Sequence, residues 1–178
     1  MSIDEVRIPK ERISILIGKN GTDKRMIERK TNTKLRVDSK EGIVTIEGDF
    51  LDVFNAKPVV KAIGRGFNPS VAEELLDEDY LLEIINIKDF AKTKQDLTRI
   101  KARIIGRKGT CRKNMESLTN TTIVVYGKTV GIIGTIQECI NAKQAIEKLL
   151  NGAKHGNVYK WLERKRGEER IEKIKGKR

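Results

Sequence analysis

The sequence has few aromatic residues, cysteines and histidines. Aromatic side chains make up 4% of its 178 residues, only two residues are cysteine, and His155 is the single histidine. One histidine supplies neither a multi-histidine metal site nor the triad of a hydrolase, so we expect no metal, no cofactor and no enzymatic activity. The wide spacing of Cys111 and Cys139 fits neither a disulfide framework nor a zinc site, and both are expected to be reduced structural thiols.

Long hydrophobic runs are missing as well. No apolar stretch approaches the roughly 18 residues of a membrane span, and the start has no secretory signal, so we expect a cytoplasmic protein without a membrane partner. Charge, in contrast, is abundant and unbalanced, with 37 Lys and Arg against 25 Asp and Glu. The formal net charge of +12 favours a polyanionic partner, because cations that neutralise phosphates release condensed counterions.

An internal repeat organises the chain. The segment 17–22, Ile-Gly-Lys-Asn-Gly-Thr, matches 105–110, Ile-Gly-Arg-Lys-Gly-Thr, and Thr-Asn-Thr recurs at 31–33 and 119–121. The next segment also aligns, with an intervening turn that is two residues shorter in the second copy. Variation in length at one place indicates a surface loop. The repeat therefore predicts two small domains of the same fold.

Hydrophobic periodicity predicts the same order of elements, β-α-α-β-β-α, in both copies. The expected elements of the first copy are a strand at 5–8, a helix opened by Pro9 and reaching Ile17, a helix at 22–31, strands at 35–37 and 43–47, and a helix at 52–63. Those of the second copy are a strand at 81–87, helices on both sides of 106–109, strands at 123–126 and 129–133, and a helix at 136–150. The expected fold class is α+β, with two three-stranded antiparallel sheets, each covered by three helices.

The charge distribution suggests where the domains end. Residues 66–79 carry five acidic and no basic side chains and follow a turn signal at Asn68 and Pro69, so we interpret them as a helical linker whose short helix Ser70 caps. The predicted domains are therefore 1–65 and 80–153. Residues 154–178 form a basic C-terminal extension, expected to be helical near the second domain and frayed beyond it.

The Gly-x-x-Gly turns carry the functional hypothesis. A turn without side chains lets the backbone approach a phosphodiester, and the N–H groups that open the following helix face the anion. Cations at the turn and in the next helical turn add attraction. The predicted RNA-binding residues are Gly18, Lys19, Asn20, Gly21, Lys24, Arg25, Gly106, Arg107, Lys108, Gly109, Arg112 and Lys113. We expect the second turn to bind more strongly, because it has Arg107 and Lys108 where the first has Lys19 and the neutral Asn20.

The same residues also fit a purely structural role. One Gly-x-x-Gly is common in ordinary helix connections, and basic residues often form a solvated face, but the two registered copies favour RNA binding. The strand residues Leu35 and Val37, with Ile123 and Val125, are expected mainly in the core and secondarily as one wall of a groove for unstacked bases.

Other motifs are weaker. Gly18-Lys19-Asn20 lacks the upstream glycine and the following Ser or Thr of a phosphate-binding P-loop, so nucleotide hydrolysis is not expected. His155 is expected in a surface turn. Cys111 follows a basic turn at a helix start, a position that predicts a lowered thiol pKa, but no partner for nucleophilic chemistry is identifiable.

Both copies resemble the type I KH domain, in which Ile-Gly-x-x-Gly follows the first short helix. The segments 62–69, 75–77, 152–156 and 158–159 further resemble the partner-of-Nob family of small-subunit ribosome-assembly KH proteins, particularly its archaeal members. The resemblance implies a clamp on about four nucleotides per domain. It also implies binding to the 3′ region of small-subunit ribosomal RNA and assistance to a separate endonuclease.

Two alternatives to this function remain open. One is a protein-interaction scaffold whose acidic linker or basic extension docks a translation or assembly factor. The other is a KH subunit that regulates or degrades messenger RNA, since one fold serves several classes of RNA.

Overall fold

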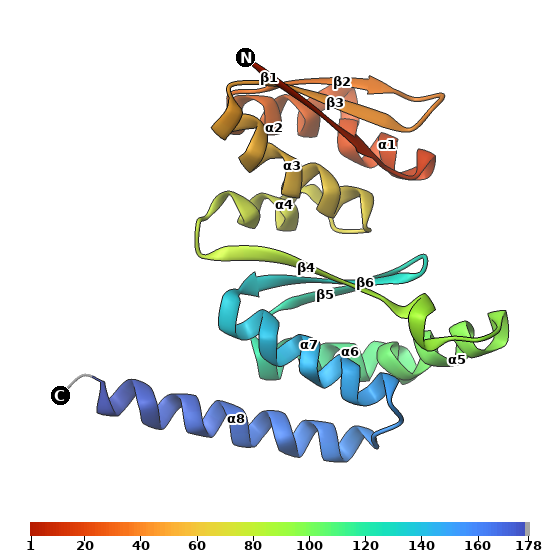
Figure 1. The fold of residues 1–178 in the computed structure, drawn as a ribbon, viewed down its shortest axis with the longest axis vertical. Helices are drawn as coiled ribbons and strands as arrows, with labels where there is room; N and C mark the ends of the chain where they lie inside the picture. Colours follow the sequence, from red (N-terminus) through yellow and green to blue (C-terminus); the bar gives the residue numbers. More distant parts are fainter. Residues whose placement is uncertain (177–178) are drawn as a thin grey trace. The chain divides into compact units, whose positions relative to one another are not determined.

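The computed structural model describes residues 1–176, which form two compact units, Met1–Leu82 and a second that begins at Glu83. Figure 1 shows the same layering in both units, with the helices on one face of a three-stranded sheet.

The first unit follows the predicted order of elements. Its bounds are β1 (Ser2–Arg7), α1 (Lys10–Ile17), the short 3₁₀ turn η1 (Lys19–Gly21), α2 (Thr22–Thr31), β2 (Lys34–Asp38), β3 (Ile43–Gly48) and α3 (Phe50–Gly64). The sheet has the order β1-β3-β2, and β3 pairs antiparallel with both neighbours. Alternate strand residues such as Leu35, Val44 and Ile46 are almost fully buried, so the core lies between this sheet and the helices.

The second unit repeats this architecture. Its first strand, β4 (Tyr80–Asn86), begins three residues before the boundary at Glu83. The further elements are the 3₁₀ turns η3 (Ile87–Phe90) and η4 (Arg107–Gly109), α5 (Lys94–Ile105), α6 (Thr110–Thr119), β5 (Thr122–Tyr126), β6 (Thr129–Thr135), α7 (Ile136–Leu150) and α8 (His155–Lys175). The sheet order is β4-β6-β5. Both sheets and their covering helices confirm the predicted α+β fold, and the observed bounds lie within three residues of the predicted ones.

Matching hydrogen bonds align the two units residue by residue. The Ile8 amide donates to the Gly42 carbonyl at 2.8 Å, and the Ile87 amide donates to the Lys128 carbonyl at 3.0 Å. An ion pair between the third helix and the first strand also recurs, since Lys57 Nζ lies 2.6 Å from Asp4 and Lys143 Nζ lies 2.6 Å from Glu83. Equivalent residues of the two units therefore differ in number by 79 in the first strand and by 86 in the third helix.

The acidic segment 66–79 packs onto α3 and belongs to the first compact unit. It contains α4 (Pro69–Ala72) and the 3₁₀ turn η2 (Glu73–Leu76), and Glu73 forms an ion pair with Lys30 of α2. The prediction that Ser70 caps this helix was wrong. Pro69 takes the first helical position, where its missing N–H costs nothing, and Asn68 occupies the N-cap, so Ser70 lies inside the helix.

The C-terminal extension is one helix as far as Lys175. Val158 and Leu162 of α8 are buried where this helix packs against α6 and α7. Asn141 Nδ2 of α7 donates to Glu169 at 2.6 Å, and the Lys148 ammonium lies 4.9 Å from the centre of the Trp161 ring. These contacts hold the helix well beyond the point where fraying was expected. Residues 177–178 of the predicted extension lie outside the described residues.

Candidate nucleic-acid interface

The two Gly-x-x-Gly turns have the same backbone geometry. The first glycine of each turn ends the preceding helix, and the backbone angles of the two are nearly identical: Gly18 has φ 72° and ψ 176°, and Gly106 has φ 74° and ψ 173°. The last glycine of each turn, Gly21 or Gly109, is left-handed at φ 74° or 75°. The sequence repeat therefore reproduces a specific turn as well as a fold.

The two glycines of a turn have different surroundings. A methyl group on Gly106 would lie 2.7 Å from the backbone nitrogen of Cys111, whereas one on Gly109 would meet nothing closer than the Lys113 side chain at 4.0 Å. In the first turn a methyl group on Gly18 would lie 2.1 Å from the Asp23 carboxylate. The first glycine is thus required by the packing of the turn itself. The last glycine of the second turn leaves an open surface for a close ligand, while in the first turn the Arg25 guanidinium lies 3.0 Å from a methyl group placed on Gly21.

The helices that follow the turns begin without a side-chain cap. At the N-cap positions Gly21 and Gly109, no side chain accepts a hydrogen bond from the first amides of α2 or α6. Helix N-terminal amides carry partial positive charge and bind anions readily. Since glycine leaves these amides unshielded, each turn presents a suitable surface for a phosphate oxygen.

Exposed cations surround both turns. Lys19 and Arg25 are exposed at the first turn, and Arg107, Lys108 and Lys113 are exposed at the second. Two of the predicted cations are instead held within the domain. Lys24 Nζ lies 3.2 Å from Glu28, and Arg112 Nη1 lies 2.9 Å from Glu116, and these four side chains are 20–31% exposed.

Lys108 has a backbone conformation that is unusual for its residue type. Among the described residues, four that are not glycine have positive φ, and the other three, Asn20, Asn32 and Asn120, are asparagines. Asparagine tolerates the left-handed region, while lysine pays a steric cost there. Lys108 therefore holds a strained position at the turn tip, a feature that is typical of functional sites.

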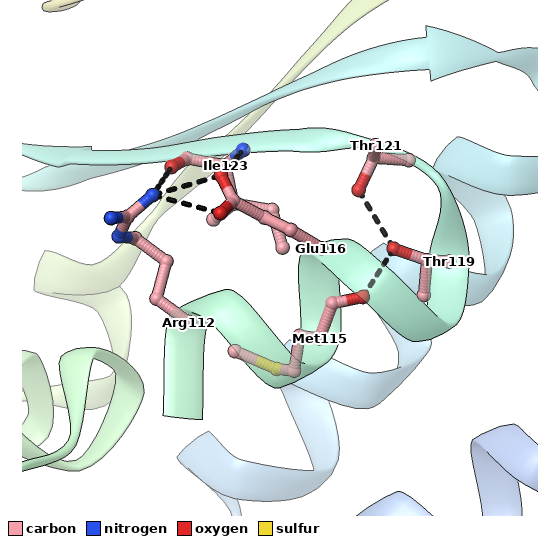
Figure 2. A network of polar contacts seen from close by, with 6 residues as sticks. All are labelled: Arg112, Met115, Glu116, Thr119, Thr121 and Ile123. Atoms are coloured by element: carbon pink, nitrogen blue, oxygen red, sulfur yellow. Dashed lines mark hydrogen bonds and ion pairs between the residues drawn. The ribbon is translucent and has the colours of Figure 1, made fainter. Parts of the chain in front are cut away.

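Glu116 ties the helix after the second turn to the adjacent strand. It accepts from Arg112 through both carboxylate oxygens, and Glu116 Oε1 accepts the backbone N–H of Ile123 at 2.8 Å, as Figure 2 shows. Glu28 makes the same bond with the Leu35 amide at 2.8 Å in the first unit. Neither glutamate was predicted as a positioning residue, although their identity across the repeat is a usable signal.

The repeated Thr-Asn-Thr motif closes the end of each helix. Thr119 Oγ1 donates to the Met115 carbonyl at 2.7 Å and lies 2.8 Å from Thr121 Oγ1 (Figure 2), and Thr31 and Thr33 make the corresponding 2.7 Å contact. The asparagine between the threonines is left-handed and ends the helix. The motif is therefore structural and sets the path into the strand that borders the turn.

The strand residues proposed for the groove divide into two kinds. Leu35 and Ile123 are buried in the core, with 1% and 0% of their surface exposed. Val37 and Val125 are half-buried, one pleat further along the same strands. Only these two valines have side-chain surface available to an unstacked base.

Helix α8 clamps the second turn from behind. The His155 Nε2 lies 2.8 Å from the Arg103 carbonyl in the last turn of α5, and Arg103 Nη2 donates to the Ala153 carbonyl at 2.7 Å. Helix α8 also packs against α6, which begins directly after the turn. The prediction of a surface turn at His155 was wrong, because contacts between distant segments fix this residue at the start of a packed helix.

The predicted low pKa of Cys111 was also wrong. Burial raises the pKa of the Cys111 thiol, and it does so more strongly than the Tyr159 hydrogen bond and the Arg103 charge lower it. Cys139 is buried too, and desolvation together with Glu83 and Glu138 raises its pKa to about 12. Both thiols are free, as expected. Among the helices of residues 1–176, none is both long and apolar enough to traverse a bilayer.

Family models match both units. The KH domain model matches residues 3–62, and the model for the second KH domain of PNO1, described as eukaryotic type KH-domain (KH-domain type I), matches residues 81–167. Together with the paired turns, these matches define the chain as a protein of tandem type I KH domains.

Two relatives are similar to this chain in sequence over most of its length. The chain is 45% identical over 170 residues to a KH domain-containing protein of Methanocaldococcus jannaschii, covering 93% of this chain and 74% of the relative. It is 32% identical over 127 residues to the pre-rRNA-processing protein PNO1 of Chaetomium thermophilum, covering 70% of this chain and 48% of that protein. The chain belongs to the PNO1/Dim2 family of KH proteins.

Solved structures agree with this assignment. The crystal structure of Dim2p from Pyrococcus horikoshii has a TM-score of 0.86 at 47% identity, covering 92% of this chain and 99% of that chain. Dim2p in the a/eIF2alpha-aDim2p-rRNA complex of the same organism has a TM-score of 0.87 at 46% identity, with 94% and 95% covered. The resemblance noted from the sequence is thus confirmed.

Proposed function

We propose that this protein is a non-catalytic ribosome-assembly factor that binds single-stranded RNA, with the 3′ region of small-subunit ribosomal RNA as its target. The observation that carries the proposal is the pair of superposable Gly-x-x-Gly turns, each with uncapped helix amides and exposed cations. The names of the relatives, a pre-rRNA-processing protein and a Dim2p solved with rRNA, support the choice of RNA class.

In this mechanism, phosphate contacts supply affinity and groove contacts supply base choice. Lys19 and Arg25, or Arg107, Lys108 and Lys113, attract the backbone to the turn. The open side of Gly109 lets a phosphate approach the helix amides, and at Gly21 the nearest side chain is the Arg25 guanidinium, itself a phosphate-binding group. Val37 or Val125 then contacts an unstacked base, while the paired side chains of Lys24 and Arg112 hold the helix in place.

The protein acts without chemistry of its own in this proposal, and it positions RNA for a separate endonuclease. We place it in the cytoplasm, where two free thiols remain reduced. Protein docking accompanies RNA binding, since the Pyrococcus relative was solved together with a/eIF2alpha.

Crosslinking the protein to RNA in its own cells and sequencing the captured RNA tests the RNA class. We expect enrichment at the 3′ end of small-subunit ribosomal RNA, and the matched control is a variant with Arg107→Asp and Lys108→Asp, which should lose this enrichment. A profile confined to messenger RNA would replace the assembly role with messenger regulation. If the variant captures this RNA as efficiently as the unchanged protein, the proposed interface is contradicted.

A further inference from the structure

A second concentration of positive charge lies at the opposite end of α1 from the Gly-x-x-Gly turn. There the end of β1, the start of α1 and the end of α3 enclose a hollow of about 630 Å³, and α3 packs against both other elements. Figure 1 shows β1 leading into α1 at this place. The cations that line the hollow are Arg7, Lys10, Lys57, Lys61 and Arg65.

The hollow carries a net positive charge. Lys57 is neutralised by Asp4, and the acidic side chains in the lining are Glu5 and Glu41. Within residues 1–176, no ion pair engages the other four cations, of which Arg7, Lys10 and Lys61 are exposed and Arg65 is half-buried. Like charges that face one concave surface repel each other, and a bound anion removes this cost.

The second unit shows that the fold does not need these cations. Equivalent positions lie 79 residues further along the chain in the first strand and 86 residues further in the third helix. The second unit retains only the ion pair between the third helix and the first strand, which is formed there by Lys143 and Glu83. The equivalents of Arg7, Lys61 and Arg65 are Asn86, Glu147 and Asn151. Since the same architecture forms with neutral or acidic residues, the positive hollow is a specific property of the first unit.

We propose that this hollow is a second phosphodiester-binding site, which extends the RNA contact of the first unit beyond its Gly-x-x-Gly turn. This inference rests on the proposed function. Helix α1 has eight residues, so its two ends lie about 12 Å apart, and a strand bound at Gly18–Gly21 can continue along α1 to the hollow. Arg7 and Arg65 provide planar donors that match phosphate oxygens.

The test compares three forms of the full chain. The site variant Arg7→Asn, Lys61→Glu, Arg65→Asn installs the residues that the second unit carries. The control variant Lys160→Asn, Arg164→Glu, Arg166→Asn makes the same change in formal charge on exposed positions of α8. Each form is titrated over a range of salt with an RNA of roughly 20 nucleotides and with one of about four nucleotides, which fills a single groove.

We expect the site variant to bind the long RNA roughly tenfold more weakly at low salt and to reduce the salt slope by about 2, because each lost contact to single-stranded RNA removes about 0.7. Its affinity for the short RNA should match that of the unchanged protein. The control variant should lose clearly less affinity for the long RNA.

Other outcomes are distinguishable. If the unchanged protein binds the long RNA and the site variant binds it equally well, the second site is overturned while the proposed function stands. If the unchanged protein binds neither RNA, the proposed function itself fails. If only binding of an acidic peptide such as polyglutamate depends on the three residues, the hollow serves a protein and the RNA site is rejected.

Discussion

The Arg112 guanidinium lies 2.9 Å from both carboxylate oxygens of Glu116, and this pairing separates it in role from its neighbour Lys113. Arg112 is half-buried, and its Nη1 also donates to the Ile123 carbonyl at 3.4 Å. Lys113 is exposed beside Gly109. Adjacent cations after one turn therefore serve the fold and the ligand separately.

Arg112→Gln should destabilise the fold, and Lys113→Gln should weaken RNA binding. Loss of the paired guanidinium should lower the free energy of unfolding by about 1 kcal/mol, since the pair is partly exposed and exposed ion pairs contribute at most about that much. Lys113→Gln should leave that free energy unchanged within about 0.5 kcal/mol. Urea unfolding and RNA titration of both variants provide the measurement. The opposite pattern would show that Arg112 is the RNA ligand.

Lys108→Asn should stabilise the protein and weaken its RNA binding at the same time. Asparagine relieves the left-handed strain at this position, a gain of up to about 1 kcal/mol, but it removes a cation from the turn tip. The mirror variant Asn20→Lys in the first turn should show the reverse. Denaturant midpoints and RNA affinities check both changes, and a loss of stability in Lys108→Asn would contradict the strain.

The two glycines of the second turn should respond differently to alanine. Gly106→Ala places a methyl group against the backbone of Cys111, so we expect it to lose clearly more stability than Gly109→Ala, whose added methyl group faces open space. Gly109→Ala still carries the cost of positive φ, about 1–2 kcal/mol. Thermal unfolding of the two variants measures which one loses more stability. Equal losses of stability would argue against the tight packing of the first glycine.

Tyr159 should make the stability fall at high pH. Burial, and to a lesser degree its hydrogen bond with Cys111, raises the pKa of Tyr159 to about 12, against about 10 in an unfolded chain. The raised value means that this stability is present below pH 10 and is lost as the pH rises through about 10 to 12. The advantage of the unchanged protein over Tyr159→Phe should therefore shrink across that window in urea unfolding. A difference that stays constant with pH would rule out this titration.

The internal repeat and the local hydrophobic periodicity were sufficient to predict the fold class and the positions of the turns. Two matched copies determined the order of strands and helices, and the turn glycines could be identified because each copy confirmed the other. Local signals were less reliable where two of them competed, as at α4, where Pro69 and Asn68 rather than Ser70 set the helix start.

Contacts between distant segments could not be predicted. Helix α8 lies outside the repeated segments, so the repeat gave no indication that His155 and Tyr159 brace the turn or that Cys111 is desolvated. The identity of Glu28 and Glu116 was visible in the sequence, but their targets are backbone amides that only the folded strand brings near. For the same reason, the positive hollow of the first unit appeared only when β1, α1 and α3 came together.

The central claim is that the Gly-x-x-Gly turns hold RNA through their cations and open backbone. Its most direct test is the affinity for single-stranded small-subunit 3′ RNA of a variant with Arg107→Asp and Lys108→Asp, measured over a range of salt beside the first-turn variant Lys19→Asp, Asn20→Asp. We expect both variants to lose affinity and salt dependence, the second-turn variant more strongly. Unchanged affinity in both variants, with the fold intact, would contradict the account.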